Sequence, residues 1–184
     1  MARSVSAPKG KGDHMTAYLE FKRKLEALDL GSVIYKLTTC REGPGWSLQL
    51  ALASEAWYRR MHFLFFKYPD LMIVPSKLVD EVWHHHVLDT QKYYEDCMAL
   101  HGRVVHHFPY LGSNGPEDAL ELDRLFQETN LKFVEEFGSS PESIGQSISC
   151  VPELLDGASV CGGCCSGNLR PRPGLRVVQT GYRH

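Results

Sequence analysis

The segment VDEVWHHHVLDTQKYYEDCMALHGRVVHHFPYLG, residues 79–112, holds six of the nine histidines and the clearest helical pattern in the chain. Residues 77–101 contain no Gly or Pro, and apolar or weakly polar side chains recur there every three or four positions. This spacing is typical of one face of an α-helix. Ser76 is a good N-cap and Gly102 a natural end. The segment predicts either one long helix or two helices separated near Asp89, whose short carboxylate suits a second cap.

Helical spacing also dominates on both sides of this segment. Helices are expected over residues 16–30, closed by Gly31, over 32–40, from about 47 to 68, and from Pro116 to a stop at Gly138. No regular alternation of apolar and polar residues predicts a strand. The sequence therefore predicts an all-α protein: a single compact bundle of four to five helices over residues 15–138, with a disordered N-terminal leader and a flexible C-terminal tail.

The two ends of the chain differ in composition from its middle. Residues 1–14 are small, basic and without apolar periodicity, and the His14-Met15 pair is typical of a vector-derived leader before a start methionine. A native basic arm is the alternative. Residues 139–184 are rich in Gly, Ser and Pro, so a flexible tail is predicted there.

Composition and charge narrow the class of function. The chain has 184 residues, enough for one domain, with 43% apolar residues, 23% charged residues and a formal net charge of −2. No long run of one charge sign indicates a nucleic-acid or membrane surface, and no stretch reaches the roughly 18 apolar residues of a membrane helix. We expect a cytoplasmic protein that binds a protein partner or a small molecule and has neither a membrane nor a nucleic acid as partner.

The six cysteines do not show the spacing of a secreted disulfide scaffold, so reduced thiols are expected. Two of them, Cys40 and Cys97, fall in the helical part. The other four form a C-x10-C-x2-C-C pattern in the tail: Cys150, Cys161, Cys164 and Cys165. That pattern could hold Zn, but the adjacent last pair suits tetrahedral closure poorly, so exposed thiols are favoured.

The histidine triplet cannot act as a three-pronged chelate on one helix. His84 and His86 are about 200° apart around a helix, whereas Asp80 and His84 are only about 40° apart. Imidazole and carboxylate are ligands for divalent transition metals, and three or four must converge on one point. The pair Asp80 and His84 therefore predicts part of a metal site.

The third ligand would come from the loop after Gly102, from His106 or His107. Such a site for Zn or Fe leaves coordination positions open, as reactive metal sites do, and would suit a metal-dependent oxidase or hydrolase. His86 and His106 are kept as reserve ligands. Further partners for the ligands are expected among Tyr93, Tyr94 and Asp96.

A packing interpretation stands beside the metal site. His86 lies on the apolar stripe next to Trp83 and suits a core histidine, while His85 and His101 are expected in solvent. His106 and His107 could cap backbone carbonyls. The protein would then be a non-catalytic interaction module. A Cys97 nucleophile is disfavoured because its position on the stripe predicts a buried thiol.

The quoted segment, with the preceding WYRRMHFLFFKYPDLMIVPS, resembles the glycine-rich domain-containing protein-like family over about residues 47–112. The matching positions are Val79, Asp80, Trp83, His84, His86, Leu88, Tyr93 or Tyr94, Cys97, Gly102 and His107. The family pattern tolerates Phe at the position of His86, which favours Asp80, His84 and His107 as the working set. Longer relatives carry Gly-rich tails, some linked to RNA binding and stress responses, and this chain has only CGGCCSG at residues 161–167.

Overall fold

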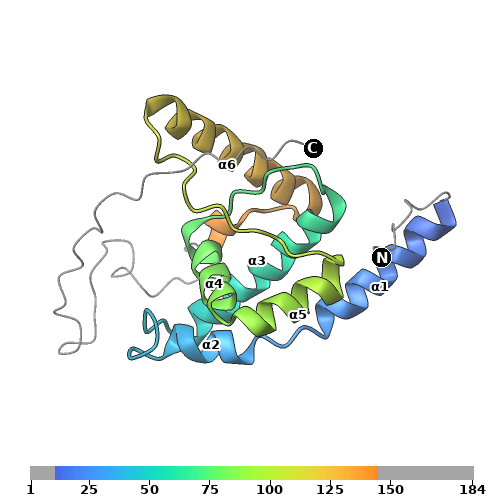
Figure 1. The fold of residues 1–184 in the computed structure, drawn as a ribbon, viewed down its shortest axis with the longest axis horizontal. Coiled ribbons are helices and arrows are strands. Elements are labelled where there is room, and N and C mark those ends of the chain that lie inside the picture. Colours follow the sequence, from blue (N-terminus) through green and yellow to red (C-terminus); the bar gives the residue numbers. More distant parts are fainter. Residues whose placement is uncertain (1–10, 145–184) are drawn as a thin grey trace.

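The computed structural model describes residues 11–144, which form six α-helices and no β-strand (Figure 1). The helices are α1 (Lys11–Glu26), α2 (Gly31–Thr38), α3 (Leu48–Lys67), α4 (Lys77–Leu88), α5 (Thr90–His101) and α6 (Pro116–Phe137), followed by a 3-10 turn at Pro141–Ser143. The predicted all-α class is confirmed. The expected number of four to five helices is too low for this part of the chain.

Helix α3 forms the centre of the core, and α2 and α4 pack against it and against each other. The Ser47 hydroxyl accepts a hydrogen bond from the Leu50 N–H at 3.2 Å and so caps the start of α3. The predicted apolar face of this helix is buried or half-buried: Leu50, Ala53, Trp57, Met61, Leu64, Phe65 and Tyr68. Burial of this stripe fixes the rotation of α3 against α4.

Asp89 separates α4 from α5, so the two-helix alternative is the correct one. Asp89 ends α4, and its side chain accepts a hydrogen bond from the Lys92 N–H at 3.5 Å at the start of α5. Gly102 ends α5 with φ 66°, a left-handed conformation that glycine adopts without strain. At the other end of α4, Ser76 occupies the N-cap position, but its hydroxyl is buried without a hydrogen-bond partner. The predicted cap geometry is present there without the capping bond.

The N-terminal helices differ from the prediction. Gly31 begins α2 instead of closing α1, which already ends at Glu26. The α1 end is held by Arg59, whose guanidinium donates hydrogen bonds to the carbonyls of Leu25 and Leu28. This contact comes from α3 and is invisible to local sequence patterns. Residues 11–14, expected in a disordered leader, belong to α1.

The chain continues to pack after α6 ends at Gly138. Pro141 and Ile144 are buried, and Ile144 belongs to the core. Residues 145–184, including the four tail cysteines, lie outside the described residues, as do residues 1–10. Among residues 11–144, no helix has the length and apolar character needed to cross a membrane.

Candidate metal centre

One face of α4 presents Asp80 and His84 together, one helical turn apart. The His84 Nε2 atom lies 3.5 Å from Asp80 Oδ2, and both side chains are partly exposed. The helical spacing predicted this contact, because residues four apart share a helix face. The pair needs a further ligand from another part of the chain.

His107 completes the group from the extended segment after α5. Its Nε2 atom lies 2.9 Å from Asp80 Oδ1 and 3.1 Å from His84 Nε2, and its side chain is 15% exposed. Asp80, His84 and His107 form the group of three that could hold a metal ion in the described part of the chain. Of the two predicted donors in this segment, His107 joins the group, while His106 is exposed beside it.

The distances within this group are close to those expected around a shared ion. Ligand atoms about 2.1 Å from an ion, at octahedral or tetrahedral angles, lie roughly 3.0 to 3.4 Å from one another. Here the two imidazole nitrogens are 3.1 Å apart, His107 Nε2 lies 2.9 Å from Asp80 Oδ1, and His84 Nε2 lies 3.5 Å from the other carboxylate oxygen, Oδ2. Two imidazoles and one carboxylate make the two-histidine, one-carboxylate ligand set that divalent transition metals use with positions left open.

The position of His107 is fixed by Trp83 and Tyr93. The His107 ring packs edge-on against Trp83, with ring centroids 4.6 Å apart. The Trp83 indole N–H donates a hydrogen bond to the Tyr93 hydroxyl at 2.8 Å, and that hydroxyl donates to the Val105 carbonyl. The segment that carries His107 is therefore tied to α4 and α5 two residues before the ligand. Of the three partners expected for the ligands, Tyr93 acts in this indirect way.

The group opens onto a cleft of about 500 Å³. Two connecting segments, residues 69–75 and 103–111, line it together with α4, and Phe65 and Leu122 line it from α3 and α6. Asp80, His84 and His107 belong to the lining. This volume lies in the range of small-molecule sites, so a ligand in the cleft could reach a metal held by the group.

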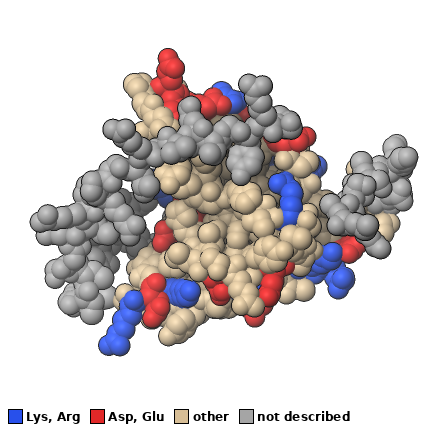
Figure 2. Space-filling view, viewed as in Figure 1, with Lys and Arg blue, Asp and Glu red and all other residues tan. Residues whose placement is uncertain are grey.

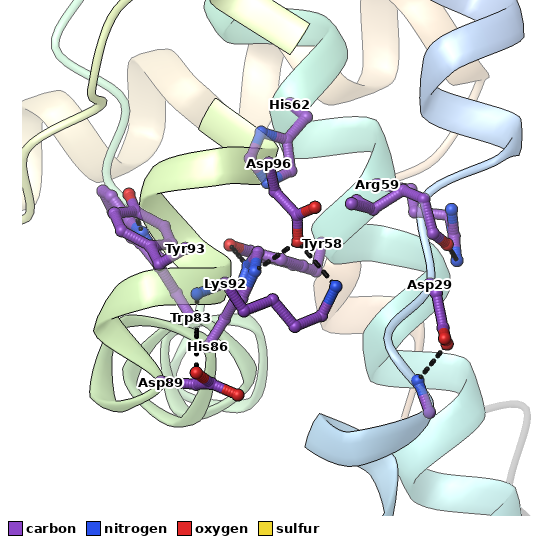
Figure 3. Close-up of polar contacts among 12 residues, drawn as sticks. Asp29, Tyr58, Arg59, His62, Trp83, His86, Asp89, Lys92, Tyr93 and Asp96 are labelled. Carbon is purple, nitrogen blue, oxygen red and sulfur yellow. Dashed lines mark hydrogen bonds and ion pairs between the residues drawn. The ribbon is translucent and has the colours of Figure 1, made fainter. Parts of the chain in front are cut away.

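His86 takes no part in this group, because it is fully buried in a different network (Figure 3). Its Nε2 atom lies 2.9 Å from Asp96 Oδ2, and its Nδ1 atom lies 2.9 Å from the Tyr58 hydroxyl. An ionised carboxylate can only accept, so Nε2 carries the proton and the Tyr58 hydroxyl donates to Nδ1. Lys92 also donates to Asp96, at 2.8 Å. The reserve role of His86 as a ligand is not supported, whereas its core placement is.

Burial sets the protonation of this network. It lowers the pKa of His86, against the opposing effect of Asp96, and raises the pKa of the Tyr58 hydroxyl well above its usual value. The ring is therefore neutral and the phenol protonated near neutral pH. Tyr58 was not foreseen from the sequence, because it lies 28 residues before its partner.

The expected exposure of His85 and His101 is wrong. His85 is 7% exposed, with Nε2 3.3 Å from Glu81 Oε1 and its ring against the turn that contains Gly43. His101 is half-buried and its Nε2 atom lies 2.9 Å from His62 Nδ1. The turn after α2 covers the first ring, and α3 covers the second.

Cys97, Tyr94 and Asp96 do not join the group of Asp80, His84 and His107. Cys97 is fully buried and burial raises the pKa of its thiol, so the prediction of a buried thiol is confirmed. Tyr94 is exposed and Asp96 binds His86, so the expectation that they support Asp80, His84 and His107 is not met.

Comparison of the chain with protein-family models, curated proteins and solved structures gives no match.

Proposed function

We propose that Asp80, His84 and His107 bind one divalent transition metal, Zn or Fe, and that this centre acts on a small molecule held in the adjacent cleft. The observation that supports this most directly is the convergence of three ligand atoms within 4.8 Å of one another. A single proton on His107 Nε2 would be shared between two acceptors there. A cation interacts with all three lone pairs at once.

The chemistry that follows is Lewis-acid or redox catalysis. Three protein ligands leave positions for water or substrate, as in metal-dependent hydrolases and in non-haem iron oxygenases. The W-H-x-H segment, with His107, is the part of the chain on which we base the proposed membership of the glycine-rich domain-containing protein-like family. The metal at this site is our proposal for what that segment does.

Elemental analysis of untagged protein tests the proposal. We expect about one equivalent of metal in the wild type and in His106→Ala, and loss of that equivalent in His84→Ala and His107→Ala. His106→Ala is the matched control, because it removes a neighbouring exposed imidazole from the same segment. The tail cysteines are common to all four proteins, so metal bound there cancels in the comparison. Equal metal content in all four proteins would refute the site.

A second candidate is a non-catalytic interaction module, and the burial of Trp83 and His86 favours it. Trp83 is 4% exposed and His86 is fully buried, so two positions of the W-H-x-H pattern serve packing. Under this alternative, His84→Ala leaves both metal content and partner binding unchanged. The same elemental analysis therefore separates the two candidates.

A further inference from the structure

The cleft beside Asp80, His84 and His107 has a second chemical feature, its unpaired positive charge. Lys77 lines it from α4 and Arg103 from the segment after α5, and among the residues that the structure describes Asp80 is the one acidic lining residue. Neither cation forms an ion pair with an acidic side chain among residues 11–144, whereas many other cations of the surface do. A metal ion at the group would add further positive charge to the same cavity.

The rest of the lining is mainly apolar. It includes aromatic and branched side chains from five parts of the chain: Phe65, Ile73, Trp83, Val105, Phe108 and Leu122. Figure 2 shows few charged side chains in the middle of the displayed face. Sites for small molecules commonly combine an apolar wall with a few polar groups that fix the orientation of the ligand.

Lys77 lies on the ligand face of α4. It precedes Asp80 by three residues and His84 by seven, so the three side chains follow one helical stripe. Arg103 follows Gly102 directly, at the start of the segment that carries His107. Helix α4 and the segment after α5 therefore each supply the cleft with at least one proposed metal ligand and one cation.

We infer that the cleft binds a small carboxylic acid with an apolar body. The carboxylate pairs with Arg103 or Lys77 and faces the proposed metal, and the apolar body lies against Trp83 and Phe65. Lys77 and Arg103 are both exposed at the cleft, so a carboxylate can form a charge-assisted hydrogen bond with either cation, whereas a neutral ligand forms only a weaker one. This inference rests on the proposed function for the position of the metal. The preference of Lys77 and Arg103 for a negatively charged ligand does not depend on the metal.

Calorimetric titration of the full-length protein tests the inference with three probes. 3-Phenylpropanoate has both the carboxylate and the apolar body, 3-phenylpropanamide lacks the charge, and acetate lacks the body. We expect the first to bind at least about tenfold more tightly than the other two, because a charge-assisted hydrogen bond contributes about 1.5 kcal/mol or more. The titrations are made on Zn-loaded protein and on protein with EDTA.

Variants assign the selectivity to residues. Arg103→Gln and Lys77→Gln should each weaken 3-phenylpropanoate binding about tenfold and leave amide binding unchanged. Arg41→Gln is the matched control, an exposed arginine outside the cleft lining with the same change of charge. Equal binding of acid and amide, or no effect of either cleft variant, would overturn the inference.

The outcomes also separate this inference from the proposed function. Zn-loaded protein that binds no probe would refute the ligand class and leave the metal centre intact. Protein that takes up no metal, yet prefers the acid through Arg103, would refute the metal centre and support the ligand class. Tighter binding of the acid with Zn than with EDTA supports both.

Discussion

At the residue scale, the three adjacent histidines of α4 have three different surroundings. His84 faces the cleft with Asp80, His85 lies under the turn after α2, and His86 is enclosed between α3 and α5. The rotation of about 100° between successive helical residues accounts for this separation. One sequence motif therefore contributes to a candidate site, to a contact with the turn after α2 and to the core.

Trp83 and His84 are neighbours with separable roles, and substitution distinguishes them. Trp83→Ala removes a buried ring and leaves the Tyr93 hydroxyl without its donor, so we expect the free energy of unfolding to fall by about 3–5 kcal/mol. His84→Ala changes a partly exposed side chain and should cost less than about 1 kcal/mol in metal-free protein. Urea denaturation in the presence of EDTA measures both.

Phe108→Ala is the control for loss of an aromatic ring. Phe108 is 60% exposed on the segment that follows His107, so its removal should change the unfolding free energy by about 0.5 kcal/mol or less. A similar cost for Trp83→Ala and Phe108→Ala would contradict the packing role of Trp83.

Residue types and helix geometry predicted much of the candidate site. The pairing of Asp80 with His84 was predicted from their four-residue spacing. A third ligand from the loop was predicted because His106 and His107 follow Gly102. Spacing alone left His106 and His107 open, and the resemblance favoured His107; the structure places His107 at the group, in a segment held by the contact of Tyr93 with Val105. His85 was misassigned because the turn that covers it lies about 40 residues earlier in the chain.

At the element scale, a buried hydrogen-bonded network joins α3, α4 and α5. Tyr58, His86 and Asp96 each come from one of these helices (Figure 3). Apolar packing alone allows a helix to slide or rotate at small cost, whereas buried polar groups require one arrangement to be satisfied. The network thus defines the register of the helix that presents Asp80 and His84.

Tyr58→Phe tests this role. The change keeps the ring but leaves His86 Nδ1 without its donor, so we expect a loss of about 1–3 kcal/mol in the free energy of unfolding. Tyr35→Phe, at a residue 63% exposed, is the matched control and should be neutral. Thermal and urea denaturation report the difference. Equal stability of the two variants would show that the bond to His86 does not contribute.

Helix positions were largely predictable, and their contacts were not. The starts of α3 and α6 and the ends of α5 and α6 follow from Ser, Pro and Gly at the expected positions. The early end of α1 depends on Arg59, which lies more than 30 residues later. Local patterns contain no information on such a contact.

At the scale of the whole molecule, stability should depend on pH through His62, which is fully buried, and its half-buried partner His101. Their rings stack with centroids 5.2 Å apart, and one hydrogen bond joins them. Burial lowers the pKa of His101 to about 4 and that of His62 well below its usual value. In the unfolded chain both rings have an ordinary pKa of about 6.5. Between these values the unfolded state binds more protons than the folded state.

The folded protein should therefore lose stability as the pH falls from about 6.5 to 4. Above this window both states are neutral at these histidines, and the stabilisation is complete. The His101 contribution over the window is roughly 2–3 kcal/mol, and His62 acts in the same direction. Urea denaturation between pH 7.5 and 4.5, with EDTA present throughout, measures the slope.

His101→Asn should flatten this slope, and His106→Asn, which removes an exposed histidine, should not. An identical pH dependence of the wild type and His101→Asn would contradict the assignment. The fold class was predictable from periodicity, but this pair was not, because 39 residues separate its members.

The surroundings of His84, His85 and His86 have a consequence for insertions and deletions. Loss of one residue within α4 ahead of the triplet would turn every later side chain by about 100°. His85 would replace His84 at the cleft, and the core position of His86 would pass to Val87. A substitution of one histidine changes the contacts of that residue alone. Deletion of one residue in this helix changes the contacts of all three positions together. We therefore expect α4 to tolerate changes of residue type far better than changes of length.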